Sequence, residues 1–228
     1  MLSFKLGEKY FRMKKLFTLL ALTISFSINS QVSTHSTSNG GLRSSAIGAW
    51  SNASADYSFA SGRATTASGY GSTVFGRNST SSGSYSIAMG YNTLASGVYS
   101  TAMGYQSTAS GGYSTAMGYQ STASGGYSKA MGYYTTASGG YGAIAMGNQT
   151  TASGDNSTVM GEGGTASGAA STAMGRGTTA SDYASLVIGQ YNSSGSSVTN
   201  SASSFNTANT AFVIGNGADS SNKSDAFK

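Results

Sequence analysis

The chain has 228 residues with 33 Gly, no Pro and no Cys, and only 8% of the residues are charged. The formal net charge of +5 is uneven, because residues 1–31 hold five Lys or Arg and one Glu, which leaves +1 for the remainder. The missing Cys excludes disulfides and thiolate metal sites, and the nearly neutral remainder offers no electrostatic footprint for nucleic acid.

Residues 1–30 have the pattern of a secretory signal peptide. A short basic start precedes an apolar run, 16–28, which is too short to span a bilayer and is followed by small polar residues. We expect cleavage near Ser30 and an exported protein, against the alternative of a buried N-terminal helix. Met13 is a second initiator that would give a more ordinary leader. Residues 31–41 follow as a polar N-terminal segment.

Residues 42–189 form a repeat. Gly recurs every seven residues between Gly62 and Gly189, with one slip of a single residue and one interruption at Asp182. Half-repeats such as STAMG and STASG alternate and make a 14-residue unit. Periodicity this strict predicts an all-β solenoid of stacked coils instead of a globular core.

Each 14-residue coil has room for two strands of four or five residues and two tight turns. We therefore predict a parallel β-roll in which Gly supplies the positive φ that the turns need. The extra residue of the slip falls within 140–143 and is expected to form a bulge at a turn.

Side chains alternate between the two faces of a strand, and the middle position of both strands is small in every coil. This pattern predicts the interior of a very thin roll. The first column is Ala46, Ala60, Val74, Ala88, Ala102, Ala116, Ala130, Ala145, Val159, Ala173, Val187 and Val213, and the second is Ala53, Ala67, Ser81, Ala95, Ala109, Ala123, Ala137, Ala152, Ala166 and Ala180.

The outer face of the first strand carries a column that is large and apolar except at Ser61. Soluble monomers rarely expose an apolar stripe of this length, and burial of one Met side chain contributes roughly 1.5–3 kcal/mol. We expect identical chains to cover it around a common axis, with Lys129, the one charge on this face, at its edge. The expected interface is Ile47, Phe75, Met89, Met103, Met117, Met131, Met146, Met160, Met174, Ile188 and Ile214.

The second strand shows Thr and Ser on its outer face, from Thr66 and Ser68 to Thr179 and Ser181, as expected for a surface in water. Ranks of Thr on a flat face are also typical of ice-binding β-solenoids, which remain an alternative. After the repeat, residues 190–209 are a Ser/Asn-rich insertion that we expect to be an exposed loop.

Residues 210–228 contain one last repeat and a polar tail. Units such as STAMG, STVMG, SAIG and LVIG, alternating with TASG, closely resemble the head repeats of trimeric autotransporter adhesins (YadA-type heads) over residues 42–217. The resemblance implies a left-handed roll, a homotrimer, and adhesion at the cell surface or outer membrane. The family's stalk and membrane anchor are not recognisable, so we expect either a fragment or another attachment route. Similar repeats also occur in phage-fibre-like proteins.

Tyr recurs at the 14-residue spacing beside the Gly positions, in two sets. Coils stacked about 4.8 Å apart would bring successive rings into contact, and aromatic rows with hydroxyl tips suit contact with proteins or sugars. Packing of the rings only against one another is the competing interpretation. The candidate adhesive residues are Tyr85, Tyr99, Tyr113, Tyr127 and Tyr141, and Tyr91, Tyr105, Tyr119 and Tyr133.

The sequence offers no catalytic constellation. His35 is the only His and has neither a Cys nor a triad partner, while Asp155, Glu162 and Asp182 look like isolated charges on turns. Trp50 is expected to be a capping or packing aromatic. We expect no enzyme activity, no metal, no cofactor and no membrane span beyond the leader. The sequence favours an exported adhesin with an unidentified extracellular protein or glycan receptor.

Overall fold

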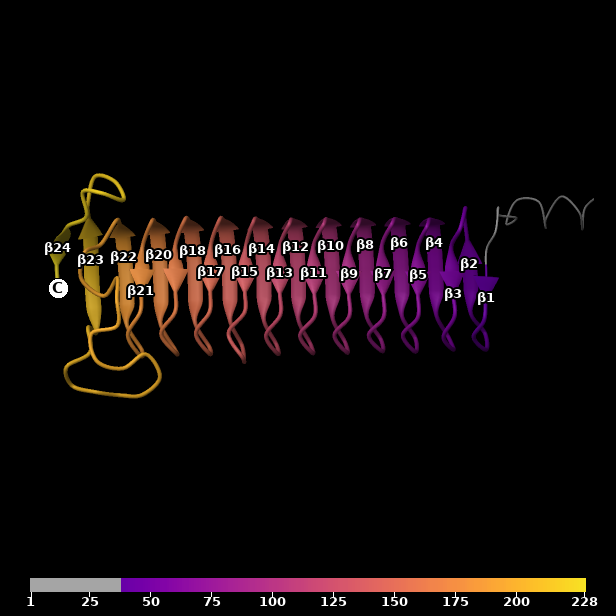
Figure 1. The fold of residues 1–228 in the computed structure, drawn as a ribbon, viewed down its shortest axis with the longest axis horizontal. Helices are drawn as coiled ribbons and strands as arrows, with labels where there is room; N and C mark the ends of the chain where they lie inside the picture. Colours follow the sequence, from indigo (N-terminus) through magenta and orange to yellow (C-terminus); the bar gives the residue numbers. More distant parts are fainter. Residues whose placement is uncertain (1–37) are drawn as a thin grey trace, which may run out of the picture.

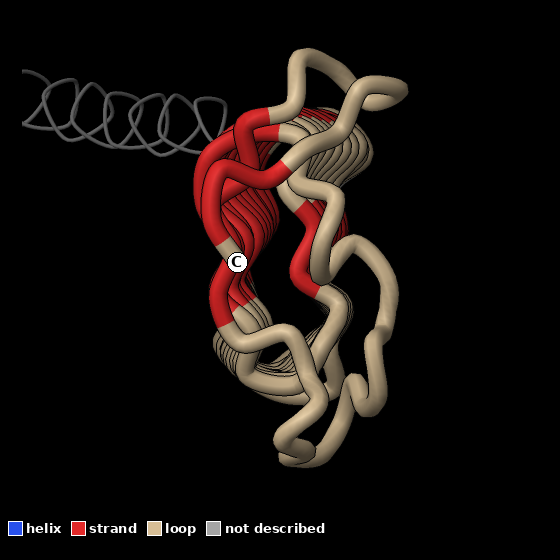
Figure 2. Tube along the Cα trace, turned by 90° about the vertical axis from the view of Figure 1, so that its left-hand side faces the viewer, coloured by secondary structure: helices blue, strands red, loops and turns tan. Residues whose placement is uncertain are grey.

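The computed structural model describes residues 38–228, which form an all-β parallel solenoid of stacked coils (Figure 1). The expected signal peptide (1–30) and His35 lie outside the described residues. Within the described range no helix is long and apolar enough to cross a lipid bilayer. Viewed end on, the coils superpose and two sheets face each other across a narrow interior (Figure 2).

Two sheets run along the whole stack, and the chain alternates between them. The small sheet is made of two-residue strands: β1 (Ser38–Asn39), β3 (Asn52–Ala53), β5 (Thr66–Ala67), β7 (Thr80–Ser81), β9 (Leu94–Ala95), β11 (Thr108–Ala109), β13 (Thr122–Ala123), β15 (Thr136–Ala137), β17 (Thr151–Ala152), β19 (Thr165–Ala166) and β21 (Thr179–Ala180).

The large sheet contains the longer strands: β2 (Ser45–Ile47), β4 (Phe59–Arg63), β6 (Thr73–Arg77), β8 (Ile87–Tyr91), β10 (Thr101–Tyr105), β12 (Thr115–Tyr119), β14 (Lys129–Tyr133), β16 (Ile144–Asn148), β18 (Thr158–Glu162), β20 (Thr172–Arg176), β22 (Leu186–Gln190), β23 (Phe212–Asn216) and β24 (Asp225–Phe227). All but the last are parallel to their neighbours.

Strand pairing follows the repeat. Met103 pairs with Met117, one 14-residue coil later, and most columns therefore stack residues of the same kind. At the slip Lys129 pairs with Ile144, so the strands stay in register and the extra residue is absorbed in the turn, as expected. There Gly126 forms an isolated bridge to Tyr141.

The interior prediction is confirmed. The described Ala and Val of the two small columns are fully buried, apart from Ala46 at the N-terminal end, which is 6% exposed. Ser and Thr beside the turns, on the same face of each strand as the interior Ala, are buried as well. Some of them bond the main chain of neighbouring turns: the hydroxyl of Ser121 donates to the Gly132 carbonyl at 3.1 Å.

The predicted length of the second strand was wrong: it has two residues, not four or five. Beyond Ala109 the chain bends at once, because the amides of Ser110 and Gly111 both donate to the single carbonyl of Ala123, at 2.9 and 3.3 Å. A ladder in which two amides share one carbonyl cannot continue as regular strand.

The prediction that Gly supplies positive φ is confirmed for one of its two columns, where φ is 98–135° from Gly62 to Gly189, whereas most of the left-handed residues in the turns are not Gly. Each coil has left-handed turn residues, and side chains such as those of Tyr113 (φ 57°) and Gln120 (φ 51°) occupy these positions. Their amides donate to the preceding coil, at 2.8 Å to Val98 and Tyr105 respectively, and these bonds hold the unfavourable conformation in place. Gly111 is needed instead because a Cβ there would overlap the carbonyl of the next coil.

The C-terminal end contains one further difference. β23 continues the parallel register of β22 after the insertion, with Leu186 opposite Phe212. The tail then turns back and adds β24 antiparallel to β23, a strand that the polar sequence did not suggest. Phe227 of this strand lies beside Phe212, with ring centroids 5.9 Å apart.

Two adjacent glycines provide a matched test of coil spacing. Gly111→Ala should destabilise the solenoid by about 1–3 kcal/mol or more, because its Cβ would overlap the backbone of Gly125. Gly112→Ala should be neutral or stabilising by about 0.4–1 kcal/mol, because the nearest atom to its Cβ is 4.0 Å away and its φ is not left-handed. Thermal melting measures both variants. Equal melting temperatures would contradict close approach as the reason for the Gly column.

Candidate functional site

The expected apolar column lies on the outer face of the large sheet. Its members are in direct register from Phe75 through Met89, Met103 and the later Met residues to Ile188 and Ile214. Neighbours in the column cover each other in part, so most are half-buried, while Phe75 and Met117 are 41% and 36% exposed. The single chain thus shows one continuous apolar stripe.

The stripe is wider than the sequence analysis proposed. The neighbouring column on the same face is Thr in many coils, but several coils place apolar residues there. Phe59 packs against Phe75 with ring centroids 5.3 Å apart. Lys129 occupies this second column, paired with Thr115 and Ile144. The additional apolar members are Phe59, Ile87, Ile144, Leu186 and Phe212.

The first tyrosine ladder runs along the turn that precedes the large sheet. Tyr85, Tyr99, Tyr113 and Tyr127 stack face to face, with successive centroids 4.8–5.1 Å apart. The sequence analysis missed that the ladder continues through Tyr70 to Tyr57, with edge-on contacts of 5.4 Å. Tyr70, like Tyr141 at the other end, comes one residue early because Gly71 or Gly142 takes the left-handed position.

The second tyrosine ladder lies at the opposite turn, at the ends of β8, β10, β12 and β14. Its rings stack with centroids 4.8–5.2 Å apart. Arg77 continues this ladder toward the N-terminus, since its guanidinium lies 5.5 Å from the ring centre of Tyr91. Tyr134 contacts Tyr133 edge-on at 4.5 Å and was not in the predicted set.

Two phenols of the first ladder, those of Tyr127 and Tyr70, have raised pKa values. A hydrogen bond to Tyr141, with the proximity of that phenol, raises the pKa of Tyr127. Desolvation, followed by the neighbouring Tyr85 and Tyr57, raises the pKa of Tyr70. Phenol groups with raised pKa keep their protons, so they offer both a donor and an acceptor to a partner.

Asp182 is not the isolated turn charge that the sequence suggested. It is fully buried at the base of the insertion, and its carboxylate accepts hydrogen bonds from the amides of Thr199 at 2.6 Å and Thr210 at 2.8 Å. Desolvation opposes the charge, but the hydrogen bonds prevail and lower the pKa of Asp182. Asp182 stands where most other coils have Gly. A side chain fits there because the small sheet ends at β21, so no further coil of that sheet lies against it.

The insertion is a loop, as predicted, but the side chain of Asn192 within it is buried and anchors it to the solenoid. Asn192 substitutes for a strand residue by bonding the amide and the carbonyl of Thr179, each at 2.8 Å. The loop covers Ser181, whose amide donates to Gly195, so the expected water-facing Ser row is buried at this end. Elsewhere the row is exposed, from Ser68 to Ser153, and its Thr neighbours are half-buried.

Residues 38–228 contain no group of three or more His, Cys, Asp or Glu side chains that could hold a metal ion. Glu162 forms an ion pair with Arg176 at 3.6 Å, and Asp155 is exposed on a turn. Trp50 is half-exposed and lies 5.1 Å from the Arg63 guanidinium, so it packs beneath a cation. None of these three arrangements joins a nucleophile to a base.

Comparison with known families gives one match. The family model described as the YadA head domain repeat, which contains two copies of the repeat, matches most of the coils. The matched residues, which make up more than half of the chain, are 40–65, 67–93, 95–121, 109–135, 138–162 and 166–192. The comparison with curated proteins gave no match.

Asp182→Asn should release the insertion from the solenoid. An amide nitrogen cannot accept a hydrogen bond, so one of the Thr199 and Thr210 amides loses its partner, at a cost of about 1–3 kcal/mol. Because the folded pKa is lowered, the wild-type stabilisation is complete above the ordinary value of 3.8 and is lost as the pH falls through the lower folded value.

Limited proteolysis of the insertion at a series of pH values measures this effect. Asp155→Asn, on an exposed turn, is the control and should be cut like the wild type. If Asp182→Asn is also cut at the wild-type rate, the carboxylate does not anchor the loop.

Proposed function

The chain belongs to the YadA head domain family, and on this basis we propose that it is the head of an exported, non-enzymatic adhesin that acts as a homotrimer. In this proposal the solenoid stands at the cell surface or outside the cell. It attaches to a protein or glycan through its turns. The YadA head family is one of structural adhesins, and the all-β parallel solenoid of this chain fits such a domain.

The observation that supports assembly best is the uncovered apolar stripe. It runs along one straight face from Phe75 to Ile214, and no described segment of the chain lies over it. An apolar surface this long marks an interaction site in a soluble protein. Parallel copies around one axis would bring the stripes together over their full length, and the family relationship supports three copies.

The stripe also explains how so thin a roll is stabilised. Its interior contains Ala and Val and little else, so each coil buries few methylene groups of its own. Ordering the backbone costs about 1–2 kcal/mol per residue. Burial of a Met or Ile in almost every coil between chains adds apolar contact where the interior is too narrow to provide it.

Adhesion is assigned to the tyrosine ladders. The residues of the first ladder are 44–54% exposed, although each contacts the ring of at least one neighbour in the ladder. Rigid aromatic side chains lose little conformational entropy on binding. Because the ladder repeats one contact along the solenoid, and the trimer repeats the ladder, weak contacts would combine through avidity.

The alternatives differ from this proposal in which surface acts. An ice-binding role would use the small sheet, where Thr of successive coils are in register, as Thr108 and Thr122 are. Its strands have only two residues, which leaves one Thr per coil in the sheet. Thermal hysteresis in the wild-type protein would favour ice binding. A phage-fibre-like role would keep the trimer and change only the attachment.

The triple variant Met103→Asp, Met117→Asp, Met131→Asp should prevent assembly, because three carboxylates per chain would face the apolar axis. Light scattering should report a single-chain mass or aggregation in place of the oligomer. The matched control adds three Asp at exposed positions that directly follow strands of the small sheet: Ser96→Asp, Ser110→Asp and Ser124→Asp. If the Met variant assembles as the control does, the interface lies elsewhere.

Replacement of Tyr99, Tyr113 and Tyr127 by Ala should reduce attachment to cells or matrix at least several-fold and leave assembly intact. Ala is tolerated at this left-handed position, since Ala170 and Ala184 occupy it with φ of 58° and 56°. Beads coated with each variant and washed under flow provide the measurement. Gln106→Ala with Gln120→Ala, at the opposite turn, is the control, and attachment equal to the control would place adhesion outside this ladder.

A further inference from the structure

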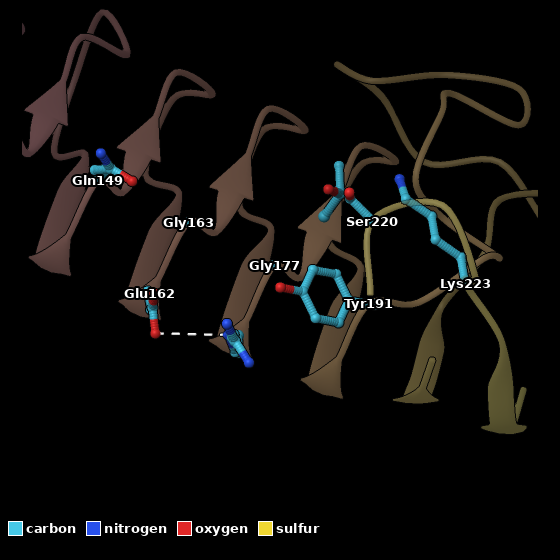
Figure 3. A pocket seen from close by; sticks show the side chains of 9 residues that line it. Gln149, Glu162, Gly163, Gly177, Tyr191, Ser220 and Lys223 are labelled. Carbon is cyan, nitrogen blue, oxygen red and sulfur yellow. Dashed lines mark ion pairs between the residues drawn. The ribbon is translucent and has the colours of Figure 1, made fainter. Parts of the chain in front are cut away.

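A hollow of about 300 Å³ lies near the C-terminal end of the solenoid, beside the turn that follows the large sheet (Figure 3). Residues from four successive coils line it, together with Ser220 and Lys223 of the tail. It is separate from the apolar stripe, and it begins where the second tyrosine ladder has ended. The size is at the lower limit of pockets that hold small molecules.

Two side chains are missing along the hollow. Each coil has one left-handed residue after the large-sheet strand, and in most described coils this residue has a side chain. In two consecutive coils it is Gly163 and Gly177. A Cβ on Gly163 would meet open space. The side chains usual at this position are those of Asn78, Asn92, Gln106, Gln120, Tyr134 and Gln149.

Gln149 lies toward one end of the hollow, and Tyr191, with Ser220 and Lys223 of the tail, lies toward the other (Figure 3). The Tyr191 ring occupies the place where a side chain at Gly177 would lie, because a Cβ there would overlap the ring. Successive coils are about 4.8 Å apart. Because the Tyr191 ring fills the layer of Gly177, only the layer of Gly163 stays open, as a slot between the Gln149 amide and the ring.

Charged groups surround the slot. Arg176 lies between the Glu162 carboxylate, at 3.6 Å, and the Tyr191 ring, 5.6 Å from its centre. Lys223 adds a second cation that forms no ion pair with any described residue. The main chain holds this cation at the rim, since the Ser224 amide donates to the Tyr191 carbonyl at 3.1 Å. The slot therefore has one positive charge in excess.

We propose that this slot binds a sugar that carries one carboxylate, such as a uronic acid residue of a glycan. The free ammonium of Lys223 would pair with the carboxylate. The Gln149 amide, the Glu162 carboxylate and the Thr179 hydroxyl would bond the sugar hydroxyls, and the Tyr191 ring would border the sugar ring. A single excess cation suits a monoanion better than a phosphorylated ligand.

This site adds a class of ligand to the proposed adhesive function. The inference rests on that proposed function. The site differs from the ladders in being formed once per chain, where the repeat is interrupted. The ladders would give many equivalent weak contacts, whereas the slot would give chemical selectivity for acidic glycans. Free sugar binds independently of attachment, so the two proposals can be tested separately.

Titration of the assembled wild-type protein with sodium D-glucuronate, followed by the amide NMR signals of Gly163 and Gly177, tests the inference. We expect saturable shifts at these amides, weakened by added salt, with little response to D-glucose. Absence of saturation with glucuronate at tens of millimolar would overturn it. Sodium acetate that binds as well as glucuronate would also overturn it, because the site would then select only an anion.

Gly163→Gln fills the slot with the side chain that Gln106, Gln120 and Gln149 carry at the same left-handed position, so the fold should be unchanged. It should weaken glucuronate binding at least about tenfold. Lys223→Ala should cause a similar loss by removing the charge-assisted hydrogen bond. Asn92→Gln, at the same position in a distant coil, is the matched control and should bind like the wild type.

Wild-type affinity in Gly163→Gln would overturn the slot as the site. If glucuronate does not bind but the protein still attaches through its tyrosine ladders, the ligand assignment fails and the adhesive function stands. If glucuronate binds and the tyrosine variant attaches like the wild type, adhesion through the ladders fails and the slot stands.

Discussion

The parallel hydrogen-bond ladder between coils is the constraint on which the rest of this structure depends. In the regular coils it places each residue directly above its counterpart 14 positions away, as in the pair Ala102 and Ala116, at a spacing of about 4.8 Å. A column must therefore consist of residues that tolerate a copy of themselves at that distance. Gly is required where the next carbonyl is too close, Ala fits the narrow interior, and Tyr stacks ring on ring.

This constraint divides the surface into faces with different roles. The large sheet shows Met and other apolar groups, the small sheet shows Thr and Ser, and the turns carry the aromatic rings. Each column has mainly one residue type, and that type sets the character of a whole face. A repeat can therefore place an assembly surface and a recognition surface on different faces of one domain. The same property limits how much apolar surface a single chain can bury, because the thin interior cannot be enlarged.

The irregular positions have a different importance. Asp182 replaces a Gly where the small sheet ends, and its buried carboxylate organises the insertion. Gly163 and Gly177 replace larger residues, and the missing side chain of Gly163 leaves a slot with an excess cation at Lys223. Such positions break the self-stacking rule, so they form features that occur once in the described chain. These features are where selectivity can arise in an otherwise uniform surface.

The sequence by itself determined the parallel solenoid, its register, the Ala interior, the outward Met column and the stacking of the tyrosines. Because the coils stack in register, the 14-residue spacing alone predicts which residues share a column. Only the tertiary structure decided which residues adopt left-handed turns, how short the second strand is, and that β24 turns back against β23. It also decided the environments of Asp182 and Lys223. The turn conformations and the strand length depend on hydrogen bonds between coils, and β24, Asp182 and Lys223 depend on contacts with segments outside the repeat. Residue spacing contains no information about either kind of contact.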